Sequence, residues 1–202
     1  MDLQSVLDTL REWPPVVVYL MLFAGAFLEY IVPPVPGDMF VIAGAVLVAA
    51  FGWHFLPVLA VVTFGAVLGA YLDFVFGKWL VRSGRLQKFG DRGQRAIGGI
   101  VTQMQRRGPA YLAINRFVPG LRAFFFVAAG IAGLTTGQVL LWSSVSALAW
   151  NALLVGVGYA LGDNLEAVET FFTRYGLIAW GLIAAVVLFF VVRALVRKMR
   201  AP

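Results

Sequence analysis

The sequence predicts an all-α integral membrane protein: two opposed re-entrant helical hairpins plus about three spanning helices, arranged as a degenerate inverted repeat. Two observations predict this fold. Hydrophobic residues make up 61% of the 202 residues, charged residues make up only 13%, and the mean hydropathy is +0.87. So much apolar surface needs lipid to cover it. In addition, Pro-Gly turns interrupt two of the apolar stretches, and charges of opposite sign lie beside the two turns.

The first half of the predicted domain, residues 15–77, contains the acidic interruption. Its apolar segments 16–28 and 39–50 are each too short to span a membrane, which takes roughly 20 residues. Glu29 and Asp38 lie between them, and the intervening turn contains Pro33, Pro34, Pro36 and Gly37. Proline lacks a backbone donor and ends helices, so such backbone survives within a membrane only where protein or a wet cavity covers it. We therefore expect a re-entrant hairpin here, followed by a spanning helix over 55–72.

The second half, residues 108–162, repeats this plan with basic residues. Segments 108–115 and 123–134 are again too short to span, and they flank Arg116 and Arg122, with Pro119 and Gly120 at the turn. A spanning helix is expected over residues 138–162. Paired halves with broken helices are typical of secondary transporters.

Charge orients the predicted domain, which covers residues 1–202. The loop 78–107 has eight basic residues and one acid, and its stretch 83–107 is expected to form a short amphipathic helix or a loop. Because basic loops stay in the cytoplasm, this loop and the basic tail 193–202 are expected there, with a third span over 175–192. The acidic connection 163–174 is then outside, and the two hairpins enter from opposite faces. The acidic start of the chain favours an outside N-terminus.

The four charged residues beside the turns are the main site candidates, because ionisable groups inside a membrane are costly and usually functional. Arginine suits phosphate because its planar fork donates two parallel hydrogen bonds. Arg116 and Arg122 are therefore candidates for binding a substrate phosphate, or else they are structural partners of the acids. Glu29 and Asp38 are candidates for proton coupling, because a partly desolvated carboxylate gains affinity for protons. Alternatively, the acids only hold the arginines in place.

Three further residues are secondary candidates. Asp73 is either a member of a proton relay or a charge at a helix end that reaches the headgroups. Trp150 and Asn151 either line a cavity or serve in membrane anchoring and helix packing. Gly65 and Gly69 form a small-residue motif whose expected role is close helix packing.

Several function classes are excluded or disfavoured by composition. The chain has no cysteine and one histidine, so we expect no metal site and no thiol chemistry. No phosphate-cradling loop of the ATP-binding kind occurs, and we expect neither an enzyme nor a cofactor. The net charge of +6 gathers beside apolar spans, which favours contact with lipid headgroups over nucleic acid. Whether the chain forms a homo-oligomer stays open.

Three motifs together resemble the DedA family of bacterial inner-membrane proteins, whose domain is also called the SNARE-associated Golgi or VTT domain. The motifs are Glu29 with Pro33-Pro34 and Pro36-Gly37-Asp38, Gly65-x-x-x-Gly69 with Gly77-Lys78, and Arg116-Phe-x-Pro-Gly-x-Arg122 with Ala129-Gly130. The resemblance implies lipid transport or scrambling that depends on the proton gradient. It also implies that Glu29, Asp38, Arg116 and Arg122 are the functional residues. Two departures from the family pattern are Asp38, where many relatives have Glu, and Ala70, where an acid or polar residue is common.

The sequence and the resemblance together predict a proton-coupled flippase that moves a phosphate-headed lipid across the inner membrane. Undecaprenyl phosphate is the first choice, because a monoester phosphate presents the greatest charge to two arginines. A scramblase of phosphatidylethanolamine-type phospholipid is one alternative, and a proton-coupled ion transporter or a membrane assembly factor is another. The direction of transport, and whether it is active, stay open.

Overall fold

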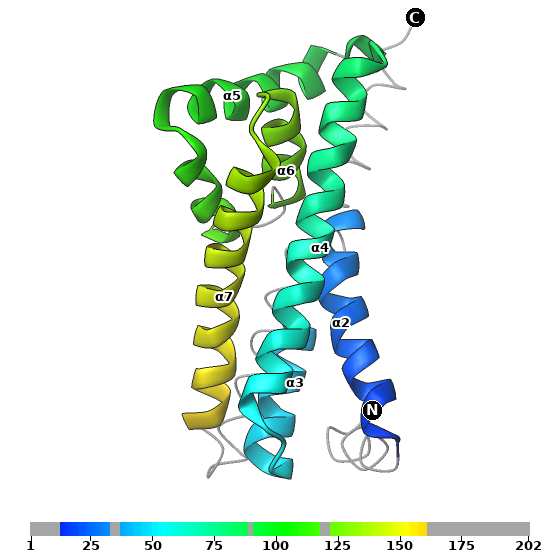
Figure 1. The fold of residues 1–202 in the computed structure, drawn as a ribbon, viewed down its shortest axis with the longest axis vertical. Coiled ribbons are helices and arrows are strands. Elements are labelled where there is room, and N and C mark those ends of the chain that lie inside the picture. Colours follow the sequence, from blue (N-terminus) through cyan, green and yellow to red (C-terminus); the bar gives the residue numbers. More distant parts are fainter. Residues whose placement is uncertain (1–12, 33–36, 89–90, 118–121, 161–202) are drawn as a thin grey trace, which may run out of the picture. The chain divides into compact units, whose positions relative to one another are not determined.

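The computed structural model describes residues 13–32, 37–88, 91–117 and 122–160 (Figure 1). These ranges contain helices and no strand, which confirms the predicted all-α class for the described part of the chain. The elements are α2 (Pro15–Ile31), α3 (Gly37–Phe51), α4 (Phe55–Arg82), η1 (Arg85–Lys88), α5 (Asp91–Arg107), η2 (Pro109–Phe117), α6 (Arg122–Ile131) and α7 (Thr136–Ala160).

Helical segments flank both interruptions, as the apolar lengths predict. Helices α2 and α3 lie on either side of the first and pack against each other, and η2 and α6 do the same at the second. Helix α2 continues past Glu29 to Ile31, so the regular helix and not the turn positions this acid. The turn residues Pro33, Pro34, Pro36, Pro119 and Gly120 lie outside the described residues. Whether the paired helices re-enter a membrane stays a prediction.

Within the described residues, two helices are long and apolar enough to cross a membrane: Phe55–Arg82 and Thr136–Val157. They match two of the three predicted spans, and the third, 175–192, lies outside the described residues, as do 163–174 and the tail 193–202. Helix α4 runs beyond the predicted boundary at residue 77 and ends at Arg82, where Gly84 adopts a positive φ of 65°. Glycine favours this conformation because it has no Cβ.

The basic segment forms a helix and not a loop. Four apolar residues of α5 recur at helical spacing and pack against the core: Ile97, Ile100, Val101 and Met104. Arg106 and Arg107 on the same helix are exposed. This is the pattern of a surface helix with one apolar face. Helix α5 packs on α6 and η2, so it covers the second pair of short helices.

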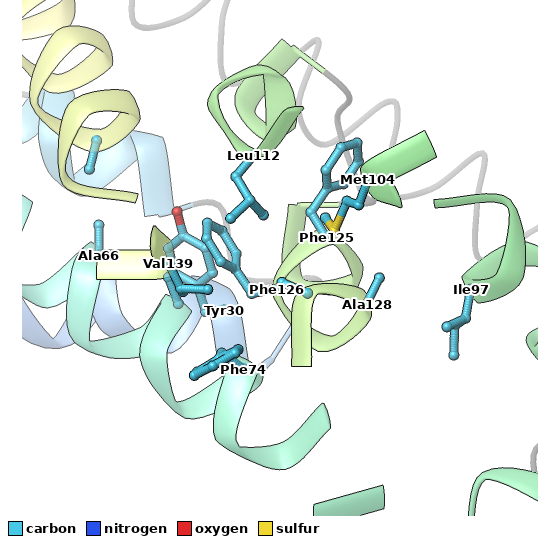
Figure 2. Packing of buried hydrophobic residues seen from close by; sticks show 13 residues of the cluster. Tyr30, Ala66, Phe74, Ile97, Met104, Leu112, Phe125, Phe126, Ala128 and Val139 are labelled. Atoms are coloured by element: carbon cyan, nitrogen blue, oxygen red, sulfur yellow. The ribbon is translucent and has the colours of Figure 1, made fainter. Parts of the chain in front are cut away.

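The described helices form two apolar clusters, and both include residues of α4 and α7. One joins α4, α5, α6, η2 and α7 around Phe74, Met104 and Phe126, and it includes Tyr30 from α2 (Figure 2). The other joins α2, α3 and α4 around Leu22, Val41 and Val62, with Val155 from α7. Many large apolar side chains nevertheless remain exposed on α2, α4 and α7, among them Leu20, Leu56, Phe64, Leu141 and Leu153. A surface of this kind is typical of a protein covered by lipid.

Glycines allow α2 and α6 to lie directly against α4. A Cβ atom at Gly65 would lie 2.6 Å from the Phe23 carbonyl oxygen, and one at Gly69 would lie 2.8 Å from that of Phe27. Further along α4, a Cβ at Gly77 would collide with the Val127 carbonyl of α6. The structure therefore confirms the packing role predicted for the small-residue motif. Figure 1 shows the result: α2 lies beside one part of α4 and α6 lies beside another.

The contact at Gly77 predicts a stability defect in Gly77→Ala. The added methyl group collides with backbone and not with a flexible side chain, so we expect a loss of about 1–3 kcal/mol. The measurement is the thermal unfolding midpoint of the purified protein in detergent. The control is Gly98→Ala in α5, where a Cβ meets nothing within 4 Å and alanine raises helix propensity. Equal midpoints for Gly77→Ala and Gly98→Ala would contradict the packing.

Candidate site: a buried cluster of two acids and two arginines

The first pair of helices brings its two acids to the same place. Glu29 lies in the last turn of α2, and Asp38 is the second residue of α3. Gly37 is needed between them, because a Cβ there would lie 2.6 Å from Cδ of Glu29. The position of Asp38 in the first turn of a helix also favours a carboxylate, since the helix dipole is positive at that end.

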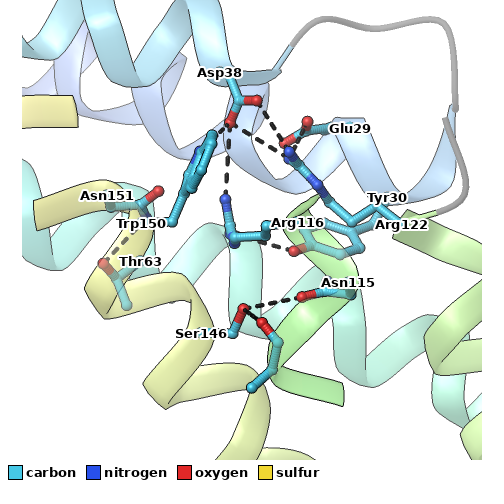
Figure 3. Close-up of polar contacts among 11 residues, drawn as sticks. Glu29, Tyr30, Asp38, Thr63, Asn115, Arg116, Arg122, Ser146, Trp150 and Asn151 are labelled. Atoms are coloured by element: carbon cyan, nitrogen blue, oxygen red, sulfur yellow. Dashed lines mark hydrogen bonds and ion pairs between the residues drawn. The ribbon is translucent and has the colours of Figure 1, made fainter. Parts of the chain in front are cut away.

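The second pair of helices presents its arginines in the same way. Arg116 lies near the end of η2, and Arg122 is the first residue of α6. They therefore lie on opposite sides of the interruption. Figure 3 shows both guanidinium groups pointing towards Asp38.

Arg122 binds both acids. Its Nη2 donates to Oδ2 of Asp38 at 2.9 Å, and its Nη1 lies 3.4 Å from Oδ1 of the same carboxylate. Nη1 also donates to Oε1 of Glu29. The contact with Asp38 is the two-point geometry that makes arginine a good partner for carboxylate and phosphate groups. Arg122 is therefore a direct partner of both acids, and such pairing is one of the two roles that the sequence analysis left open for the arginines.

Arg116 is held differently. Its Nη1 forms an ion pair with Oδ1 of Asp38 at 3.8 Å, and its Nη2 donates to the Tyr30 hydroxyl at 3.2 Å. Its Nε is buried and has no hydrogen-bond partner among the described residues. The Arg116 side chain is 2% exposed, against 11% for Arg122. Arg116 is therefore the more deeply buried arginine and the one with the weaker contact to an acid.

Helix α7 contributes two of the secondary candidates. The indole nitrogen of Trp150 donates to Oδ1 of Asp38 at 3.0 Å, so Trp150 belongs to the site. The neighbouring Asn151 is fully buried, and its Nδ2 donates to Oγ1 of Thr63 on α4 at 3.2 Å. Asn151 thus joins the two candidate spanning helices beside the site, while its own Oδ1 has no partner in the described structure.

Sequence reasoning missed Tyr30, Asn115 and Ser146. Tyr30 accepts the hydrogen bond from Arg116, and Oδ1 of Asn115 accepts one from the Ser146 hydroxyl at 2.9 Å. All three side chains are buried. A signal for two of them was present, because Tyr30 directly follows Glu29 and Asn115 directly precedes Arg116. Polar residues beside intramembrane charges are natural hydrogen-bond partners for those charges or their helices.

The third secondary candidate, Asp73, is not part of this cluster. Its Oδ2 is buried and has no hydrogen-bond partner among the residues that the structure describes. His54 is exposed at the start of α4. Within the described ranges, no group of three His, Cys, Asp or Glu residues is arranged to hold a metal ion.

The formal charges of the cluster cancel, because two carboxylates face two guanidinium groups. This balance matters energetically, since an isolated buried charge costs several kcal/mol whereas a paired and hydrogen-bonded one is tolerated. Asp38 contacts Arg116, Arg122 and Trp150 at once, so it is the centre of the cluster. A change in the charge of Asp38 must therefore alter the binding of both arginines.

Comparison with known proteins identifies the family. The VTT domain profile matches residues 35–160, a range that contains Asp38, both arginines and Trp150. The inner membrane protein YghB of Salmonella typhimurium is 32% identical over 153 residues, which cover 72% of this chain and 68% of YghB. The chain belongs to the DedA/VTT family. The resemblance predicted from the three motifs is thereby confirmed.

Two other relatives of this DedA/VTT protein carry different names. The inner membrane protein YqjA of Escherichia coli is 27% identical over 155 residues, covering 73% of this chain and 69% of YqjA. An alkaline phosphatase-like protein of Lactococcus lactis subsp. cremoris is 28% identical over 174 residues, covering 81% of each chain. No solved structure gives a significant match. Since YghB and YqjA are named as inner membrane proteins, the chain is assigned to the bacterial inner membrane.

The charge balance of the cluster predicts a large and recoverable loss of stability. Arg122→Met leaves Glu29 and Asp38 without their shared partner, so we expect a loss of about 3–5 kcal/mol. Adding Glu29→Gln to Arg122→Met leaves Asp38 facing Arg116 and returns the cluster to zero net charge, so it should recover part of that loss. The measurement is unfolding in detergent for the single and the double variant. A double variant that is no more stable than Arg122→Met would contradict this charge balance.

Proposed function

We propose that this protein is a proton-coupled flippase for a membrane lipid with a phosphate headgroup, most simply undecaprenyl phosphate. The observation that carries the proposal is the convergence of Arg116 and Arg122 on the single carboxylate of Asp38. A phosphate offers arginine the same arrangement of two oxygens that a carboxylate offers. A lipid phosphate can therefore compete with Asp38 for these guanidinium groups.

Protons supply the coupling in this proposal. With both acids ionised, the cluster is neutral and the arginines are occupied. Each proton that binds to Glu29 or Asp38 removes one negative charge. After two protons have bound, the two arginines give the cluster a net charge of +2. A phosphate monoester has a charge of about −1.5 to −2 at pH 7, which matches this surplus. A phospholipid phosphodiester has a single negative charge and matches it less well, which favours undecaprenyl phosphate.

The proton gradient is the driving force in this scheme, and no cofactor takes part. Binding of a proton and of a lipid phosphate are linked because both act on the same carboxylate–guanidinium contact. A ligand shifts an equilibrium only through its differential affinity for two states. Here the state with protonated acids binds phosphate, and the state with ionised acids releases it.

The proposed membrane arrangement places both interruptions at mid-depth. Helices α2 and α3 form a re-entrant hairpin from the outside, and η2 and α6 form one from the cytoplasm. Packing supports this, because α2 contacts α4 at Gly65 and Gly69 while α6 contacts α4 further along, at Gly77. The protein is then multi-pass, with the basic helix α5 and the C-terminus in the cytoplasm.

Two other functions stand as alternatives. A phosphatidylethanolamine-type scramblase would use the same arginines without needing a gradient. A proton-coupled ion transporter would use the acids without a lipid substrate. We do not propose an enzyme, although two relatives are named alkaline phosphatase-like. Our reason is that the described residues offer no cluster of metal ligands, and the site contains arginines paired with acids rather than a nucleophile beside a base.

Lysine substitutions separate phosphate binding from structural pairing. Arg116→Lys and Arg122→Lys keep the charge but lose the two-point contact, so transport of labelled undecaprenyl phosphate in proteoliposomes should fall roughly tenfold or more. The yield of folded protein should change little. The matched control is Arg106→Lys on the exposed surface of α5, which should transport like the wild type. If the cluster variants also transport normally, the arginines are structural cations. The transport rate of labelled phosphatidylethanolamine, measured in parallel, shows which of the two lipids the protein prefers.

Amide substitutions test the proton coupling. Asp38→Asn mimics the protonated state, so lipid binding should remain measurable while stimulation of transport by a pH gradient is lost. Glu29→Gln should behave similarly if both acids bind coupled protons. The measurement compares lipid transport with and without an imposed pH gradient. Full gradient stimulation in Asp38→Asn would exclude Asp38 as a coupling site. Proton flux in vesicles without the lipid would instead support the ion transporter.

A further inference from the structure

Asp73 differs from Glu29 and Asp38 because no arginine forms an ion pair with it in the described structure. Its Oδ2 is buried without a hydrogen-bond partner in the described structure, whereas Glu29 and Asp38 both receive hydrogen bonds from Arg122. A buried carboxylate without a partner is strongly disfavoured relative to the neutral acid, which can donate a hydrogen bond of its own. The surroundings of Asp73 therefore favour a group that takes up a proton.

The position of Asp73 connects it to the charged cluster. Gly69 lies one helical turn earlier on the same face of α4, and a Cβ there would lie 3.0 Å from Cβ of Tyr30. Four residues of α-helix rise about 6 Å, so Asp73 lies about one turn from this contact. Tyr30 in turn accepts a hydrogen bond from Arg116. Asp73 thus lies on α4 between the cluster and the end of the helix that leads to the basic segment.

No charged group described in the surrounding elements neutralises Asp73. Lys78, the nearest base in sequence, lies over the ring of Phe74 at 4.4 Å and forms no ion pair with Asp73. Besides Asp73, the titratable or charged residues on the described parts of α4 and the elements packed against it are Tyr19, Glu29 and Tyr30 on α2, Asp38 on α3, Arg122 on α6, Tyr159 on α7, Arg85 and Lys88 on η1, and Tyr71, Lys78 and Arg82 on α4 itself. Of these, Glu29, Asp38 and Arg122 are engaged with one another.

The chemistry of the site favours a proton over a metal ion. Calcium and magnesium need about six or more oxygen ligands. Asp73 supplies a single carboxylate, and no group of three potential ligands occurs in the described ranges. A proton needs only one lone pair, which the buried Oδ2 provides.

We propose that Asp73 is a second proton-binding site, separate from the four-charge cluster, that lies on the side of the basic segment and takes part in the proton coupling. In each exchange the carboxylate gains one proton and loses its negative charge, and no bond between heavy atoms changes. The proposal rests on the proton coupling of the proposed function and adds a residue to it. It also accounts for a half-buried acid, with one buried carboxylate oxygen, that the arginine cluster leaves unused.

The experiment uses the full chain, reconstituted in lipid vesicles, with Asp73→Asn and Asp73→Glu. The first measurement is infrared difference spectroscopy across a pH titration, which detects the carbonyl band of a protonated carboxylic acid. We expect a titrating band in the wild type, its loss in Asp73→Asn and its shift in Asp73→Glu. The second measurement is lipid transport with and without a pH gradient. We expect Asp73→Asn to lose the gradient stimulation and Asp73→Glu to restore most of it.

The two measurements test separate claims, so one claim can be wrong while the other stands. If the wild type carries no lipid, the proposed function is wrong, but the infrared titration still tests proton binding at Asp73. A carboxylic acid spectrum in Asp73→Asn identical to that of the wild type would overturn the proposal, as would full gradient stimulation of its transport. If Asp73→Asn does not insert into the vesicles, the infrared band of Asp73→Glu tests the proposal by itself. A band at the wild-type position in Asp73→Glu would then overturn the proposal.

Discussion

The pairing of one buried carboxylate, Asp38, with two arginines is the interaction on which the described structure depends. Each of these charges alone would be costly in an apolar surrounding, but together with Glu29 they sum to zero. The pairing is long-range, because Asp38 comes from the first interruption and both arginines come from the second. Each half of the chain therefore contains charges that only the other half can neutralise, so the halves must assemble for either to be stable in lipid.

Close helix packing makes this pairing geometrically attainable. Glycines on α4 let α2 approach at Gly65 and Gly69 and let α6 approach at Gly77, so one long helix positions a short helix from each half. Apolar packing between helices gains little in lipid, because the lipid tails are equally apolar. Close contact between backbones supplies van der Waals attraction instead. The same packing brings Tyr30 against Phe126, with ring centroids 5.7 Å apart, and so joins the first half to the core of the second.

The two arginines are not equivalent, and the difference suits a cycle of binding and release. Arg122 is held by two carboxylates, so its surroundings change most when those acids gain protons. Arg116 is held partly by the neutral Tyr30 hydroxyl, which keeps its hydrogen bond whatever the charge of the acids. One guanidinium group is therefore released by protonation while the other stays oriented. The indole of Trp150 similarly gives Asp38 a neutral donor that does not depend on the arginines.

The sequence by itself determined the membrane class, the helices on both sides of each interruption and the residues that form the charged cluster, because apolar length and intramembrane charge are local properties. The family followed from short motifs of the same kind. Tertiary structure decided the rest. It made the basic segment a helix with an apolar face against the core, and it gave Arg122 two acids and Arg116 one acid with a tyrosine. Within the described ranges it left Oδ2 of Asp73 without a hydrogen-bond partner. Tyr30 and Asn115 stand beside charged candidates in the sequence, but their hydrogen-bond partners, and any role for Ser146, could be assigned only once the fold brought distant residues within hydrogen-bond distance.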